Sequence, residues 1–184
     1  MNDTRTQTVT PPITVRPSQD DDLPRIQAIY AHHVLHGTGT FELEPPSLAE
    51  ITRRRADVLG NGFSWLVAQR GDTVLGYAYA NLFRTRPAYR FTLEDSIYIA
   101  PEAMGQGVGR RLLEALLADC QARGCRQVLA VIGDSGNQGS IALHAACGFE
   151  MNGVLRAVGW KFGRWLDVVM MQRALGEGDG SSPA

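Results

Sequence analysis

The stretch FTLEDSIYIAPEAMGQGVGRRLLEALLADC, residues 91–120, carries the strongest indication of the fold. Apolar and polar side chains alternate over residues 91–99, which is the period of a strand. Three glycines follow at every second position, and beyond them apolar residues recur at helical spacing as far as Cys120. The stretch therefore predicts a strand, a glycine-rich turn and a helix.

The glycine-rich turn predicts a phosphate-binding site. A turn of this kind at the start of a helix leaves several backbone N–H groups unpaired at the positive end of the helix dipole. Arg110 and Arg111 add positive charge beside it. The dinucleotide fingerprint GxGxxG is not met, because Arg110 stands at its third glycine position, and the turn lacks the lysine of a P-loop. An ordinary glycine-rich loop is the alternative.

Composition indicates an ordinary soluble globular protein with one domain. The 184 residues are 44% hydrophobic and 20% charged, enough for a full core. The net charge of −1 gives no electrostatic case for nucleic acid or a membrane surface, and no apolar run approaches the roughly 20 residues of a membrane span. The three cysteines have apolar neighbours, so we expect buried free thiols in a cytoplasmic protein, and no His/Cys spacing suggests a metal site.

The order of predicted elements defines the fold class. We expect strands at residues 13–16, 64–70, 73–83, 91–99, 127–132, 149–155 and 165–175, and helices at residues 23–36, 47–59, 108–123 and 137–147. Successive strands imply antiparallel pairing, and two strand–helix units imply a parallel portion. The chain is therefore predicted to be α/β, with a central mixed sheet flanked by about four helices. The domain should cover residues 13–175, between disordered tails at residues 1–12 and 176–184.

Two motifs resemble the GNAT N-acetyltransferase superfamily. Residues 104–109, MGQGVG, are similar to its acetyl-coenzyme A motif Q/R-x-x-G-x-G/A, although Met104 stands at the Q/R position. Residues 137–149 look like its segment N-x-x-S/A-x-x-L-Y-x-x-x-G-F, with His144 in place of the usual tyrosine. The resemblance implies the GNAT fold, in which two parallel strands splay apart and acetyl-coenzyme A (acetyl-CoA) enters the split. It implies these cofactor-binding residues: Ile97, Tyr98 and Ile99 through their backbone, then Gly105, Gln106, Gly107, Val108, Gly109, Arg110, Asn137 and Ser140.

Longer strings resemble one branch, the phosphinothricin and methionine sulfoximine N-acetyltransferases. They are A-Y-x-x-T-x-E-x-S-x-Y in residues 88–98 and G-x-K-x-G-x-W-x-D-V in residues 159–168. The similarity spans about residues 13–173. It implies transfer of an acetyl group to the α-amine of a small amino acid or analogue, a small-molecule amine, in an enzyme that is usually a homodimer.

Glu94 and His144 are the predicted catalytic residues. An amine must lose a proton before it attacks the thioester, so a base is needed. The branch places its base at Glu94 on the central strand, where burial would raise the pKa of the carboxyl group. His144 would protonate the departing thiolate, since the pKa of an imidazole lies near neutrality. A packed histidine, with water as the acid, is the alternative.

A cluster of arginines before Glu94 suggests an anionic substrate, because arginine binds carboxylates in a bidentate way. We predict four substrate-binding residues: Arg84, Arg86, Phe41 and Tyr30. Solvated surface arginines and aromatic core residues are the alternatives, and Lys161 and Asp167 have no predicted role. Two other functions stay open: a GNAT enzyme that acetylates a protein N-terminus or a polyamine, and a non-catalytic acyl-CoA-binding module.

Overall fold

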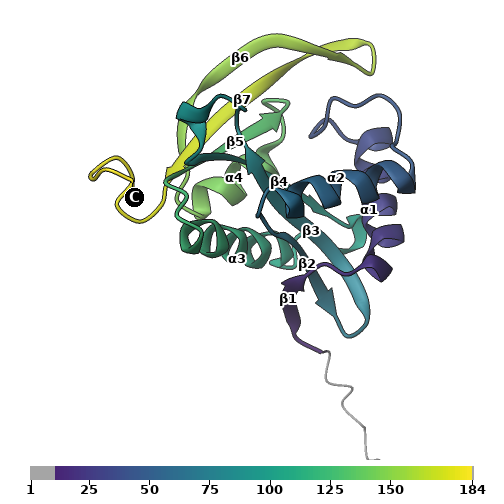
Figure 1. Cartoon of the computed structure of the whole chain (residues 1–184). Helices are drawn as coiled ribbons and strands as arrows, with labels where there is room; N and C mark the ends of the chain where they lie inside the picture. Colours follow the sequence, from purple (N-terminus) through teal and green to yellow (C-terminus); the bar gives the residue numbers. More distant parts are fainter. Residues whose placement is uncertain (1–10, 184) are drawn as a thin grey trace, which may run out of the picture.

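The computed structural model describes residues 11–183, and within them the strands form one seven-stranded sheet of order β1-β2-β3-β4-β5-β7-β6 (Figure 1). Its strands are β1 (Ile13–Pro17), β2 (Trp65–Arg70), β3 (Thr73–Leu82), β4 (Thr92–Ile99), β5 (Gln127–Gly133), β6 (Glu150–Lys161) and β7 (Arg164–Ala174). The helices are α1 (Leu23–His36), α2 (Leu48–Gly60), α3 (Val108–Ala122) and α4 (Gln138–Ala146). The predicted α/β class, with a mixed sheet and about four helices, is confirmed.

The sheet splits between its two parallel strands. β4 and β5 pair in parallel from Thr92 and Gln127 as far as Asp95 and Ala130. Beyond that point β4 stays paired with β3 up to Ile99, whereas β5 stays paired with β7 up to Gly133. The two strands therefore separate, and residues 96–99 present an edge that β5 leaves open.

The helices cover both faces of the sheet around this split. The side chain of Tyr98 packs on Tyr30 of α1, with ring centroids 4.8 Å apart. Asp95 instead contacts His144 of α4. Successive side chains of a strand point to opposite faces, so α1 and α4 lie on opposite sides of β4. Helix α3 lies beside α4 and buries leucines of its apolar stripe against β2, β3 and β4.

The β6–β7 hairpin extends beyond the rest of the sheet (Figure 1). The sequence pattern predicted only residues 149–155 for its first strand, but β6 runs to Lys161. A register shift between Leu155 and Gly159 breaks the two-residue period there, which hides the second half of the strand from periodicity. Apolar side chains remain exposed along the hairpin: Leu155, Val158, Trp160, Phe162 and Trp165.

The structure describes most of the predicted C-terminal tail but little of the predicted N-terminal tail. Residues 1–10 of the predicted N-terminal tail lie outside the described residues. Residues 176–183 form turns, and Arg126 contacts both Glu177 and Ser181 there. Within residues 11–183, none of the helices is long and apolar enough to cross a membrane.

Candidate active site

A cavity of about 810 Å³ lies where β4 and β5 separate. It is lined by the open edge of β4, the end of β5, the glycine-rich turn and one side of α4 as far as His144. The start of the α1–α2 loop, residues 37–41, closes another side. The split therefore brings together segments from four regions of the sequence that carry predicted site residues.

The glycine-rich turn presents bare backbone to this cavity. Gly105 and Gly107 have φ of 71° and 78°, the left-handed region that glycine adopts without strain. No other group lies within 4 Å of where a Cβ would stand on either residue. Gly107 is the N-cap of α3, so the first N–H groups of that helix lack helical partners. The side chain of Arg110 stands beside them and pairs with Glu114. This is the geometry of an anion site.

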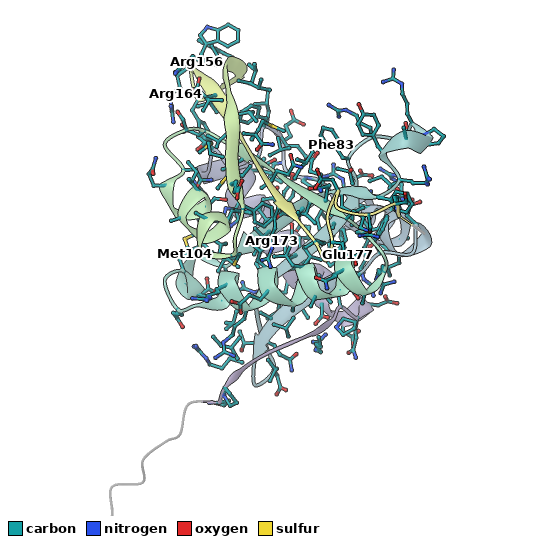
Figure 2. All side chains as sticks on the ribbon, turned by 90° about the vertical axis from the view of Figure 1, so that its left-hand side faces the viewer. Phe83, Met104, Arg156, Arg164, Arg173 and Glu177 are labelled. Carbon is teal, nitrogen blue, oxygen red and sulfur yellow. The ribbon has the colours of Figure 1, made fainter. Side chains whose placement is uncertain are left out.

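The side chains of Met104 and Gln106, in the glycine-rich turn, point to different places. Met104 lines the cavity and is about half exposed at the molecular surface (Figure 2). The side chain of Gln106 does not line the cavity, because it donates to the carbonyl of Glu102 at 2.7 Å and accepts from Arg70 at 3.0 Å. Cofactor binding by Gln106 therefore stays a prediction that depends on its backbone.

The open edge of β4 presents fewer backbone groups than predicted. Hydrogen bonds from Phe83 to the carbonyl of Thr92, and from Ala100 to the carbonyl of Leu75, fix which residues of β4 face β3. The backbone N–H and C=O groups of successive strand residues point alternately to the two sides of the strand. The backbone groups of Tyr98 therefore face β3, and those of Ile97 and Ile99 face the split. Tyr98 was predicted to offer its backbone to the cofactor, and the ladder with β3 corrects this.

His33 also reaches this edge, which sequence reasoning missed. Its Nε2 lies 2.8 Å from the carbonyl oxygen of Ile99 and donates to it. Burial lowers the pKa of His33, which favours the neutral imidazole. Three histidines lie within five residues on α1, and no pattern in the sequence singles out this one.

Glu94 lies in the cavity with its carboxylate half-buried. Its side chain alternates with that of Asp95, so it is on the α1 face of the sheet. Burial and the neighbouring charge of Asp95 raise the pKa of Glu94, and Arg84 opposes them. Within residues 11–183, no hydrogen bond or ion pair engages the carboxylate. A half-buried carboxylate with a raised pKa and free oxygens suits a general base.

His144 is buried on the other face of the sheet, where it lines the cavity. Its Nδ1 lies 2.7 Å from the carbonyl oxygen of Ser140, and its Nε2 lies 3.1 Å from Oδ2 of Asp95. Burial lowers the pKa of His144, but the hydrogen bond and charge of Asp95 outweigh it and leave the pKa raised. Sequence reasoning missed Asp95, which is 49 residues away from His144 in the chain.

Asn137 and Ser140 begin α4 at the cavity wall. Oδ1 of Asn137 accepts from the backbone N–H of Ser140 at 3.3 Å, so Asn137 caps the start of the helix. Both residues line the cavity, which leaves the amide Nδ2 of Asn137 and the hydroxyl of Ser140 close to any ligand there.

The four predicted substrate-binding residues are not all brought together. Phe41 lines the cavity. Tyr30 is buried beneath the α1–α2 loop, where its hydroxyl bonds to Thr40 and Glu42, both at 2.9 Å. Arg84 and Arg86 are exposed and lie outside the cavity lining.

Lys161 and Asp167 hold the region around Phe41 in place. Nζ of Lys161 is buried and donates to the carbonyl of Thr40 at 2.8 Å. Asp167 accepts from the backbone N–H of Ala157, at the register shift of β6, and from Ser135 after β5, both at 2.9 Å. The bulged part of β6 is thereby fixed against the α1–α2 loop.

Comparison with known proteins agrees with this geometry. Residues 27–149 match the Acetyltransferase (GNAT) family, and the chain belongs to this family. The chain is 59% identical to phosphinothricin N-acetyltransferase of Alcaligenes faecalis over 170 residues, which cover 92% of this chain and 86% of that one. It is 38% identical to the L-methionine sulfoximine/L-methionine sulfone acetyltransferase of Pseudomonas aeruginosa, over 86% of this chain and 92% of that one.

The fold is the GNAT fold. The crystal structure of a GNAT superfamily phosphinothricin acetyltransferase from Sinorhizobium meliloti, in complex with acetyl-CoA, superposes with a TM-score of 0.90. The two chains are 48% identical, and the match covers 94% of this chain and 93% of that one.

Proposed function

We propose that this GNAT N-acetyltransferase transfers the acetyl group of acetyl-CoA to the α-amine of a small amino acid or analogue, of the phosphinothricin or methionine sulfoximine type. The observation that carries the proposal is the cavity at the β4–β5 split, which joins an anion-binding turn to a free carboxylate, Glu94. The names of the relatives support the acceptor class.

The residues at the split fit acetyl-CoA as the acyl donor. Its pyrophosphate suits the bare backbone after Gly105 and Gly107, with Arg110 as the nearby cation. Its pantetheine arm carries amide groups, which suit the unpaired backbone of Ile97 and the amides of Ile99 and Asn137.

Glu94 is assigned the role of general base. It takes a proton from the substrate ammonium, directly or through water, so that the neutral nitrogen attacks the thioester carbon. A C–N bond forms, the nitrogen gives up its second proton to water, the C–S bond breaks, and the thiolate leaves with its electron pair. An unpaired backbone N–H of the β4 edge is placed to stabilise the developing oxyanion. His144 is the proposed acid for the thiolate, and transfer is direct, with no enzyme-bound intermediate.

The acceptor carboxylate is assigned to the arginines that precede Glu94. Arg84 stacks on Phe83, with its guanidinium carbon 4.4 Å from the ring centroid, and its charge already acts on Glu94. We assign Arg84 and Arg86 to the rim of the acceptor site and Phe41 to its apolar wall.

We further propose a homodimer that uses the β6–β7 hairpin. Its exposed apolar side chains, among them Trp160, Phe162 and Trp165, form a surface that favours burial against a second copy of the chain. Arg156 and Arg164 lie toward the end of this hairpin (Figure 2). The three cysteines are free and buried, which supports a cytoplasmic location.

Thiol release from acetyl-CoA tests the proposal. The acceptors are phosphinothricin, methionine sulfoximine, methionine sulfone, the common amino acids, spermidine and a short peptide. We expect turnover with the amino-acid analogues, a large loss in Glu94→Gln, and wild-type rates in Glu44→Gln, whose side chain is exposed. Turnover only with the peptide or spermidine would replace the acceptor class. Cofactor binding without any turnover would favour the acyl-CoA-binding module.

A further inference from the structure

Asp95 and His144 form a buried pair where β4 and β5 separate. Asp95 is the last residue of β4 that pairs with β5. The two side chains are about 1% and 2% exposed, and both residues line the cavity. No pattern in the sequence indicates a partner for His144, so this pair follows from the three-dimensional arrangement alone.

The hydrogen bonds of the imidazole determine its protons. Nδ1 faces the carbonyl oxygen of Ser140, which only accepts, so Nδ1 carries a proton. Nε2 faces a carboxylate oxygen of Asp95, and two lone pairs cannot share that contact. A second proton therefore lies between Nε2 and Oδ2. The hydroxyl of Ser140 also lies 3.4 Å from Nδ1. The ordinary pKa of an imidazole is above that of a carboxyl group, so the proton between Nε2 and Oδ2 belongs to the ring, and the pair is an imidazolium beside a carboxylate.

Within residues 11–183, Asp95 is the charged group that acts on the pKa of His144. Phe149 meets the ring edge-on, with centroids 5.0 Å apart. Cys120 of α3 and Cys147, which follows α4, are close enough to sense Asp95, but burial raises the pKa of both thiols and keeps them neutral. Glu94 is the neighbouring carboxylate, on the opposite face of the sheet. Oδ1 of Asp95 is buried without a hydrogen-bond partner in residues 11–183, so the imidazolium is its main compensation.

We propose that Asp95 is a positioning residue that keeps His144 doubly protonated at neutral pH, so that the imidazolium can protonate the leaving thiolate. This inference rests on the acetyltransferase function proposed above. A tyrosine at this position would keep its proton to pH ~10, whereas an isolated imidazole, with pKa ~6.5, would be only about 3% protonated at pH 8. Asp95 counteracts this low degree of protonation by stabilising the imidazolium.

The step balances in protons and electrons. The C–S bond breaks and sulfur keeps its electron pair. The thiolate then takes the Nε2 proton, which leaves a neutral imidazole whose Nδ1–H still donates to the carbonyl of Ser140 and whose Nε2 needs a new proton to restore its contact with Asp95. Glu94 holds the first proton from the ammonium, and the second proton of that nitrogen passes to solvent as the amide forms. Solvent then returns the pair and Glu94 to their starting states.

Nitrogen-15 NMR of the imidazole tests the protonation without turnover. In the wild-type protein without ligand, we expect both ring nitrogens of His144 to show protonated shifts at pH 7.5. The signal would be assigned by comparison with His144→Tyr. In Asp95→Asn, which keeps the shape of the side chain, the ring should become neutral at that pH. A neutral ring in the wild-type protein would overturn the proposal, even if Asp95→Asn fails to fold.

The pH profile of kcat tests the functional part. We expect Asp95→Asn to lower kcat about tenfold at pH 8.5 and less than about threefold at pH 6.5, as for a pKa that falls by about one unit. In a His144→Tyr background the same substitution should change kcat less than about twofold at either pH. Equal losses at both pH values in both backgrounds would show a merely structural role and overturn the proposal. If the wild-type enzyme acetylates no amine, the proposed function fails while the NMR result still decides the protonation.

Discussion

Replacing Gly159 with alanine tests how the β6–β7 hairpin holds Phe41 at the cavity. A Cβ added to Gly159 would lie 2.2 Å from Cε2 of Phe41 and 2.5 Å from Cδ2. Carbon atoms in contact are about 3.5–4.0 Å apart, so the ring must move by about 1.3 Å or more. On its other side the ring abuts Gly133, where an added Cβ would be 3.0 Å from Cε1. The ring therefore has little room to retreat deeper.

We expect Gly159→Ala to destabilise the protein by about 1–3 kcal/mol, the usual cost of overpacking. Because Phe41 lines the cavity, KM for the acceptor should rise several-fold while KM for acetyl-CoA changes little. Urea unfolding and steady-state kinetics measure the two effects. Gly60→Ala is the matched control, because no group lies within 4 Å of the added Cβ at the end of α2.

A double-mutant cycle decides whether Phe41 carries the effect. In a Phe41→Ala background the space beside Gly159 is open, so Gly159→Ala should cost much less than it does in the wild-type protein. Equal costs in both backgrounds, or a Gly159→Ala protein with wild-type stability and acceptor KM, would refute the assigned packing.

Three further predictions concern the base, the buried lysine and the hairpin. Glu94→Gln should lower kcat by about 10²–10⁴-fold and remove the acidic limb of the pH profile, where the raised pKa of Glu94 lets the base become protonated; a retained limb would assign it to another group. Burial lowers the pKa of Lys161 below 10.5, so the folded state holds fewer protons and stability should rise as pH increases toward 10.5. Lys161→Met should abolish this increase of stability with pH, which unfolding at several pH values measures. Without the bond to Thr40 it should also raise the acceptor KM, which steady-state kinetics measure. Trp160→Glu should shift sedimentation toward the monomer, whereas Leu59→Glu, on exposed α2, should not; an unchanged mass for the Trp160 variant would place the interface elsewhere.

The fold could be predicted because the signals for its helices and strands each lie within a short stretch of sequence. Alternation, helical spacing and the glycine turn are visible within short windows, and the observed boundaries differ from the predicted ones by the usual one or two residues. The second half of β6 escaped because its bulge breaks the alternation that reveals a strand.

The site was harder to predict because its contacts are distant in the chain. The bond from Lys161 to Thr40 spans 121 residues, and no pattern within one segment indicates it. Asp95 stood beside Glu94 in the same string, but only the position of α4 shows that the two carboxylates have different partners. The role of the arginines stays a prediction, since charge clustering near Glu94 indicated binding residues that the fold leaves exposed outside the cavity lining.

The two neighbouring carboxylates of β4 show how one strand could serve the two proton transfers that we propose. Because adjacent side chains point to opposite faces, Glu94 is on the side of α1 and Asp95 on the side of α4. A base needs a raised pKa and free oxygens. The charge of Asp95 contributes to the raised pKa of Glu94. An acid needs a retained proton, and the same charge holds that proton on His144. Removing the charge of Asp95 should therefore move both limbs of the pH profile to lower pH. A separate, unlinked base and acid would move only one.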